Sequence, residues 1–155
     1  RAVPSPEPRR IVEMKAIRLL LAAGATVICA GGGGVPIARG PGHAFHGVEA
    51  VVDKDLCSAL LARELHADAL LLLTDVDACY LNWRQPDATP IGAIIPADLR
   101  KHRFAEGSMA PKVEAACRFV ENGGQFAGIG RMEDALAILG GRAGTRVIPS
   151  DRAIR

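Results

Sequence analysis

A run of five apolar residues, from Ala69 to Leu73, constrains the fold of this chain more than any other stretch. A half-exposed strand alternates apolar and polar residues, whereas a short unbroken apolar run is typical of a strand buried on both faces. Such strands belong to parallel sheets with helices on both sides. The run ends at the polar segment 74–77, and open α/β sheets bind ligands at the carboxyl ends of their strands. The sequence therefore predicts an α/β fold with a site at this edge.

Helix and strand patterns alternate along the rest of the chain. The capping signal Ser5-Pro6-Glu7 predicts a helix that ends at Gly24. Further helices are expected over residues 53–65, 113–121 and 132–139. Strands are expected over residues 26–30, 126–129 and 145–148, with a short extended piece within 45–52. This alternation favours an α/β class with a mainly parallel sheet.

Four consecutive glycines, Gly31, Gly32, Gly33 and Gly34, follow the apolar stretch 27–30. Residues without a Cβ let backbone N–H groups approach another group closely, and we expect that group to be a phosphate. A merely flexible turn is the alternative interpretation. The chain contains no complete P-loop and no complete Gly-x-Gly-x-x-Gly, so its motifs indicate neither a Walker ATPase nor a dinucleotide-binding fold.

Composition narrows the class of protein. The 155 residues are 49% hydrophobic and carry a formal net charge of +2, with the basic residues scattered. This pattern gives no electrostatic footprint for nucleic acid or an anionic membrane, and no apolar stretch is long enough to span a bilayer. The four cysteines are widely spaced in apolar segments, which is typical of a reduced cytoplasmic protein. Because the sequence does not begin with Met, we expect it to lie within a longer chain.

Two lysines are expected at helix starts, where an ammonium group normally opposes the helix dipole. Lys54 lies between Asp53 and Asp55, and Lys112 follows Pro111. Phosphoryl transfer spreads negative charge over oxygen atoms, so fixed cations and N–H donors are what its transition state requires. Together with the glycine run, these residues favour such chemistry. Taken singly, either lysine would be expected to point into solvent.

The polar residues after the apolar run are candidates for nucleotide binding. Thr74, Asp75 and Asp77 have groups that could contact a ribose, a base edge or a magnesium-bound water, and Tyr80 could lie against the base. A capped turn after a strand explains the same residues equally well.

Several blocks of the sequence resemble the carbamate kinases of the amino acid kinase superfamily. They are residues 29–36, 47–55, 73–78 and 104–115, followed by 133–136 and 143–146. The resemblance covers nearly the whole chain with the blocks in order. It implies a three-layer αβα sandwich with a mainly parallel central sheet. It also implies reversible phosphoryl transfer between ATP and carbamate, which yields ADP and carbamoyl phosphate.

The resemblance also assigns roles to particular residues. Lys54, Asp55 and Lys112 would be catalytic, and Gly31, Gly32, Gly33, Gly34 and Asp53 would bind phosphate or substrate. The nucleotide would be bound by Thr74, Asp75, Val76, Asp77, Tyr80, Met109 and Pro111. ATP or ADP would be the substrate with Mg²⁺, whose ligands stay unassigned. Members of the family act in the cytoplasm in arginine catabolism through the arginine deiminase pathway, and the full-length proteins form homodimers.

The resemblance extends to only half of a family member. Residues 1–155 correspond to the nucleotide-binding carboxyl-terminal part of an amino acid kinase-like domain, and the other half carries a further lysine and much of the carbamate site. We therefore expect a fragment that is inactive until completed. Two alternatives stay open. One is a kinase of the same superfamily that acts on another small carboxylate, and the other is a nucleotide-binding regulatory module without catalysis.

Overall fold

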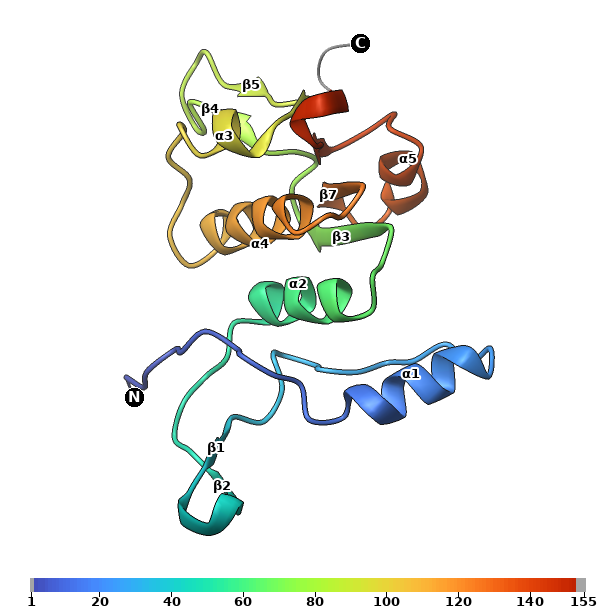
Figure 1. Cartoon of the computed structure of the whole chain (residues 1–155). Coiled ribbons are helices and arrows are strands. Elements are labelled where there is room, and N and C mark those ends of the chain that lie inside the picture. The colour runs from blue at the N-terminus through green and yellow to red at the C-terminus, as the bar shows by residue number, and fades with distance from the viewer. Residues whose placement is uncertain (1, 153–155) are drawn as a thin grey trace.

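The computed structural model describes residues 2–152 and shows alternating helices and strands (Figure 1). The helices are α1 (Met14–Ala22), η1 (Pro41–His43), α2 (Lys54–Glu64), α3 (Pro96–Leu99), α4 (Met109–Glu121), α5 (Ala135–Leu139) and η2 (Ser150–Arg152). The strands are β1 (Ile37–Arg39), β2 (Phe45–Gly47), β3 (Ala69–Thr74), β4 (Tyr80–Leu81), β5 (Thr89–Pro90), β6 (Ala93–Ile94), β7 (Phe126–Arg131) and β8 (Thr145–Val147). The α/β class is confirmed.

The main sheet has the strand order β3-β7-β8-β6. The apolar run forms β3, which pairs with β7 in parallel, with Leu71 opposite Gly128. Strands β8 and β6 are also parallel, whereas β7 and β8 are antiparallel. Two of these three pairings are parallel, so the prediction of a mainly parallel sheet is confirmed.

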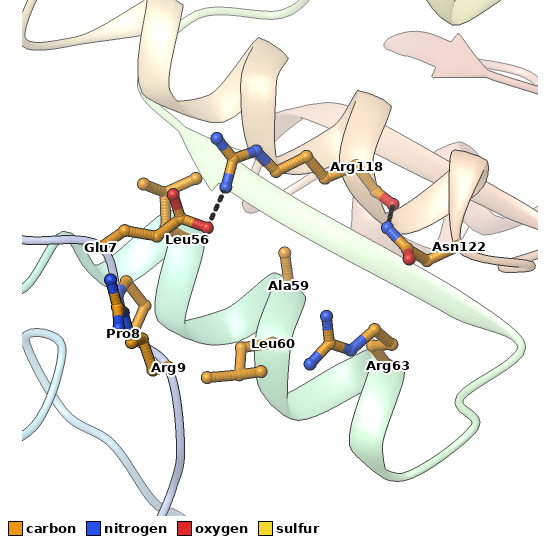
Figure 2. A pocket seen from close by; sticks show the side chains of 9 residues that line it. All are labelled: Glu7, Pro8, Arg9, Leu56, Ala59, Leu60, Arg63, Arg118 and Asn122. Atoms are coloured by element: carbon orange, nitrogen blue, oxygen red, sulfur yellow. Dashed lines mark hydrogen bonds and ion pairs between the residues drawn. The ribbon is translucent and has the colours of Figure 1, made fainter.

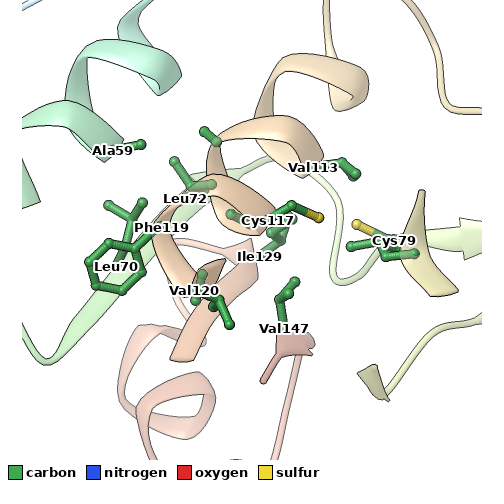
Figure 3. Packing of buried hydrophobic residues seen from close by; sticks show 14 of the residues in the cluster. Ala59, Leu70, Leu72, Cys79, Val113, Cys117, Phe119, Val120, Ile129 and Val147 are labelled. Carbon is green, nitrogen blue, oxygen red and sulfur yellow. The ribbon is translucent and has the colours of Figure 1, made fainter. Parts of the chain in front are cut away.

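Strand β7 separates two helical layers. Ala127 and Ile129 are fully buried in the core that α4 covers, where Val113, Cys117 and Phe119 pack against them (Figure 3). Gly128 and Gly130 face the opposite side, toward α5. A Cβ at Gly128 would lie 2.4 Å from Cγ2 of Ile138, so α5 packs closely because β7 has glycine at positions 128 and 130 of that face. The sheet therefore lies between helices, as a three-layer sandwich requires.

Helix α2 is the outer neighbour of α4 and β3 (Figure 1). Leu60 of α2 is buried, and Leu56 packs against the core as a partly buried residue. The helix expected over residues 53–65 is thus confirmed to within a residue at each end. Its packing against α4 brings the first turns of the two helices together.

The amino-terminal helix begins later than the capping signal predicted. Residues 2–11 contain no helix, and α1 starts only at Met14. Other contacts hold this segment instead: the carbonyl of Pro4 accepts a hydrogen bond from the Val51 N–H at 3.0 Å, and Glu7 pairs with Arg118 of α4. Tertiary contacts therefore override a local helix-start signal.

The strand predicted over residues 26–30 is absent within residues 2–152. The segment has no regular secondary structure, Ala30 at its end has a φ of +63°, and no strand of the described part pairs with it. The short extended piece expected within 45–52 is limited to β2, which forms an exposed hairpin with β1. The helix expected over 132–139 starts at Ala135. None of the helices in the described part has the length and apolar character needed to cross a lipid bilayer.

Candidate functional site

The first turns of α2 and α4 bring a carboxylate and two lysines together. Nζ of Lys112 donates to both carboxylate oxygens of Asp55, at 3.0 and 3.2 Å. Both side chains are buried, and Nζ of Lys54 lies 3.7 Å from the same carboxylate. Lys54 is more than half exposed, so its ammonium group remains available to a ligand. Asp55 thus holds one buried cation and lies beside a second, solvent-facing one.

Asp53, two residues before Asp55, makes different contacts. Asp53 is the N-cap of α2, and its Oδ1 accepts hydrogen bonds from the backbone N–H groups of Asp55 and Leu56, both at 2.9 Å. Among the described residues neither lysine pairs with it. Asp53 therefore fixes where α2 begins, and so fixes the positions of Lys54 and Asp55.

Helix α4 begins at Met109, four residues earlier than expected, and contains Pro111 in its first turn. Proline is tolerated there because its missing N–H would lack an intrahelical partner in any case. The early start moves Lys112 inside the helix, where its side chain turns into the buried pair instead of solvent. The expectation that Lys112 lies before the helix is corrected.

The glycine run lies against the start of α2, and the lack of side chains allows the two backbones to come close. A Cβ on Gly33 would lie 2.1 Å from the Val52 carbonyl oxygen and 3.3 Å from the Lys54 nitrogen, and its φ is +129°. The close partner of Gly33 is thus the protein's own backbone. Gly31, Gly32 and Gly34 have open space around their Cβ positions. No other part of the protein therefore packs against these three positions, and they flank the glycine that contacts the start of α2.

A pocket of about 120 Å³ lies at the carboxyl end of β3. Its lining combines the turn after β3 with the segment that leads into α4: Thr74, Asp75, Val76, Ala78, Tyr80, Trp83, Arg103, Phe104, Ala105, Ser108 and Met109. Met109 is three residues from Lys112 in α4, so this pocket and the lysine pair share the start of one helix. The site expected at this sheet edge has a cavity with aromatic walls and polar groups.

Five of the seven residues predicted to bind a nucleotide line this pocket, while Asp77 and Pro111 do not. Asp77 instead accepts a hydrogen bond from the Tyr80 hydroxyl, at 3.0 and 3.1 Å to its two oxygens. This bond, with a smaller effect of burial and of the Asp77 charge, raises the pKa of Tyr80. Asp77 therefore orients Tyr80 at the wall of the pocket.

Trp83 and Arg103 also line the pocket, and the sequence analysis missed both. The Trp83 ring lies 5.1 Å from that of Tyr80, centroid to centroid. Trp83 follows Tyr80 by three residues in a segment rich in turn residues, and a lone aromatic there could have served as the signal. Nothing in the pattern around Arg103 distinguishes it from a surface arginine.

A second cavity, of about 200 Å³, lies between the amino-terminal segment and the outer faces of α2 and α4 (Figure 2). Residues 7–9 form one wall, and Arg63 and Arg118 lie on the two helices. Figure 2 shows the ion pair between Glu7 and Arg118 closing one side. Its lining runs along α2 from Leu56 to Arg63 and includes Arg118 near the end of α4, but neither Lys54 nor Lys112 belongs to it.

Metal-binding capacity is low within residues 2–152. No group of three or more His, Cys, Asp or Glu side chains is arranged to hold a metal ion there. Magnesium in phosphoryl-transfer sites keeps few protein ligands and is held largely by substrate phosphates and water. A magnesium ion held in that way would need no cluster of protein ligands.

A mainly parallel α/β sheet with a pocket at its carboxyl edge, a glycine loop and a buried lysine–carboxylate pair defines a class of α/β protein with a site suited to anionic ligands. The family model of the amino acid kinase family matches residues 2–129, and the chain belongs to that family.

Carbamate kinases are among the known relatives of this chain. The chain is 46% identical to the carbamate kinase of Haemophilus influenzae over 154 residues, covering 99% of this chain and 50% of that protein. It is 49% identical to the carbamate kinase of Rhizobium meliloti over 152 residues, covering 97% and 47%. The structure of the carbamate kinase from Giardia lamblia bound to AMP-PNP superposes with a TM-score of 0.91 at 40% identity, covering 95% and 48%. The chain spans about half the length of the curated relatives it matches.

Proposed function

We propose that this chain is the carboxyl-terminal half of a carbamate kinase, with residues 1–155 as one nucleotide-binding unit. The complete protein would transfer a phosphoryl group reversibly between ATP and carbamate, giving ADP and carbamoyl phosphate. The observation that carries the proposal is the buried Asp55–Lys112 pair with Lys54 beside it, next to a pocket at the sheet edge. Relatives of 45–49% identity that are carbamate kinases support the same reaction.

The geometry suggests how the residues divide the work. The Giardia relative is bound to AMP-PNP, which supports nucleotide binding by this chain. The base of ATP would occupy the pocket between Tyr80, Trp83 and Met109. The phosphates would then run along the start of α4 toward Lys112 and Lys54. Gly31, Gly32 and Gly34 would offer backbone N–H groups to the same phosphates.

In the transfer step a carbamate oxygen forms a bond to the γ-phosphorus while the bond to the ADP oxygen breaks. The acceptor is already an anion, so the step needs no general base. Lys54 and Lys112 would neutralise the charge that spreads over the phosphoryl oxygens, and Asp55 would hold Lys112 in place. Mg²⁺ bound through phosphate oxygens would add positive charge there. The proposal includes that the complete protein forms a homodimer, lies in the cytoplasm and acts in the arginine deiminase pathway.

The test is ATP formation from ADP and carbamoyl phosphate. The assay is run on the 155-residue chain and on the chain completed with the unmatched half of the Haemophilus relative. Lys54→Ala in the completed form should lower kcat by about 100-fold or more, because one cation of the transition state is lost. Lys101→Ala is the matched control, since Lys101 is a 71% exposed lysine that pairs only with Asp98. Equal activity of Lys54→Ala and wild type would refute the proposed role of Lys54.

Nucleotide binding can be followed separately, because Trp83 is the single tryptophan of the chain and lines the pocket. ADP should change its fluorescence. ADP binding without turnover in the completed form would instead favour a regulatory nucleotide-binding module. Turnover with acetylglutamate or aspartate, and none with carbamate, would favour another small-carboxylate kinase.

A further inference from the structure

Thr145, the first residue of β8, is fully buried and bonds to two separate stretches of backbone. Its Oγ1 accepts a hydrogen bond from the Cys79 N–H at 2.8 Å and donates one to the Ile91 carbonyl at 2.6 Å. The Ile91 N–H in turn donates to the Cys79 carbonyl at 2.8 Å, so the three residues form one closed group. A buried hydroxyl that satisfies two backbone groups at once holds both of them in a defined position.

Cys79 lies directly behind the wall of the pocket at the sheet edge. It is fully buried in the apolar core (Figure 3), while its neighbours Ala78 and Tyr80 both line the pocket. Its Sγ lies 3.4 Å from Sδ of Met109, a further lining residue and the first residue of α4. Thr145 therefore holds the backbone of the wall segment, residues 78–80, from the side away from the pocket.

Two glycines let the wall segment and β8 come this close. A Cβ on Gly130 of β7 would lie 2.8 Å from the Asp77 carbonyl oxygen, so the chain that leads into the wall segment passes directly against β7. A Cβ on Gly144, next to Thr145, would lie 2.7 Å from the Ile129 carbonyl oxygen. The backbone before Thr145 and the backbone before the wall segment are thus both pressed against the same strand.

We propose that Thr145 is a positioning residue for nucleotide binding: through Cys79 its hydroxyl fixes Tyr80 and Met109 in the wall of the pocket. The proposal rests on the proposed function, which makes a nucleotide the ligand of this pocket. Among the described residues no hydrogen bond or ion pair joins Thr145 to Lys54 or Lys112. Loss of the hydroxyl should therefore weaken ADP binding and spare the transfer step.

The kinetics of the form completed with the unmatched half of the Haemophilus relative test this role. Thr145→Val keeps the branched shape and removes the hydroxyl, so the KM for ADP should rise about 10-fold or more while kcat stays within about twofold. Thr145→Ser keeps the hydroxyl and should have the wild-type KM. Val147→Ala is the matched control, because Val147 is a fully buried residue of the same strand that does not line the pocket. It should lower the melting temperature and leave the KM unchanged.

The wall segment can also be followed without a ligand in the 155-residue chain. Tyr80 and Trp83 are its single tyrosine and single tryptophan, and their ring centroids lie 5.1 Å apart, so their packing should dominate the near-ultraviolet circular dichroism. Thr145→Val should lose most of this signal with the far-ultraviolet signal unchanged, whereas Thr145→Ser and Val147→Ala should keep it. If Thr145→Val does not fold, Thr145→Cys takes its place, because a thiol is a weak donor and acceptor.

The outcomes separate positioning from a general effect on the core. An unchanged KM in Thr145→Val would overturn the proposal, as would an equal rise in Thr145→Ser or Val147→Ala. A near-ultraviolet signal that Thr145→Val retains would also overturn it. A wild-type completed form that makes no ATP would refute the proposed function instead, and the near-ultraviolet signal would then decide whether Thr145 positions the wall segment.

Discussion

At the scale of single residues, the buried Asp55–Lys112 pair is the feature whose loss should matter most for stability. Lys112→Met leaves the Asp55 carboxylate buried without its partner, which should cost about 3–5 kcal/mol of unfolding free energy. Replacing both residues, as Asp55→Leu with Lys112→Met, should cost less than the single change, because no buried charge is left. Urea unfolding of the 155-residue chain measures both.

The exposed pair Lys101–Asp98, at 2.6 Å, gives the control for this prediction. Lys101→Met should change the unfolding free energy by less than about 1 kcal/mol, because water screens a surface pair. A double variant less stable than Lys112→Met would contradict the interpretation of the pair as a buried, mutually dependent unit.

Gly33 allows a second residue-scale prediction. Gly33→Ala adds a methyl group 2.1 Å from the Val52 carbonyl oxygen at a φ of +129°, so the loop must move away from α2. Strain of this kind should lower the unfolding free energy by about 1–3 kcal/mol. Gly32→Ala is the control, because its Cβ meets nothing within 4 Å. Equal thermal midpoints of the two variants would show that the loop does not depend on this contact.

At the scale of elements, ion pairs join α3 to α4. Arg100, which follows α3, pairs with Glu114 and Glu121 of α4, and Arg118 pairs with Glu114 at 2.6 Å. Burial opposes the ionisation of Glu114, yet the hydrogen bonds from Arg118 and Arg100 outweigh it and lower the pKa of Glu114. The folded state therefore favours the ionised carboxylate.

This lowered pKa gives a pH dependence with a definite sign. The contribution of Glu114 should be fully present above the pKa of an unfolded glutamate, about 4.3, and should disappear as the pH falls through the lower folded value. Wild type should therefore be more stable than Glu114→Gln at neutral pH, and the difference should shrink toward about pH 3. Urea unfolding across this range measures it. A constant difference would contradict the assignment.

Whether the sequence predicts a helix or strand correctly depends on which contacts stabilise that element. Helix α2 and strands β3 and β7 carry their own signals, a capping Asp53 and unbroken apolar runs, and they pack within this chain. Residues 26–30 have the same kind of apolar signal, but no neighbouring strand pairs with them within residues 2–152. The helix signal at Ser5 loses to contacts with Val51 and Arg118, which lie far away in sequence.

Some residues of the candidate site could likewise be predicted from local sequence signals, whereas others depend on tertiary packing. Lys54 and Lys112 could be predicted because a lysine at a helix start opposes the helix dipole, and Asp55 because it adjoins Lys54. Which of Asp53 and Asp55 pairs with Lys112 could not be predicted, since it depends on the packing of α2 against α4. Trp83 and Arg103 reach the pocket through irregular chain, whose path the sequence does not specify.

At the scale of the whole molecule, the four cysteines report how completely the core is closed. Cys57, Cys79 and Cys117 are buried, and burial raises the pKa of both Cys79 and Cys117 to about 11. Cys29 is only half-buried. A thiol reagent at about pH 8 should therefore label Cys29 quickly and the other three only after unfolding, because the thiolate is the reactive form. Rapid labelling of all four in the native chain would show an open core.

The order of strands in the sheet has a consequence for synthesis. Strands β7 and β8 occupy the middle of the sheet, yet they are the last two strands of the described residues. More than fifty residues separate β3 from β7, the strand with which it pairs. A growing polypeptide therefore cannot complete this sheet until β7 and β8 have left the ribosome. Helix α2 and strand β3 emerge earlier with their apolar faces bare, when chaperones would have the most surface to bind. Premature termination before β7 would leave β3 and β6 without their neighbours in this sheet.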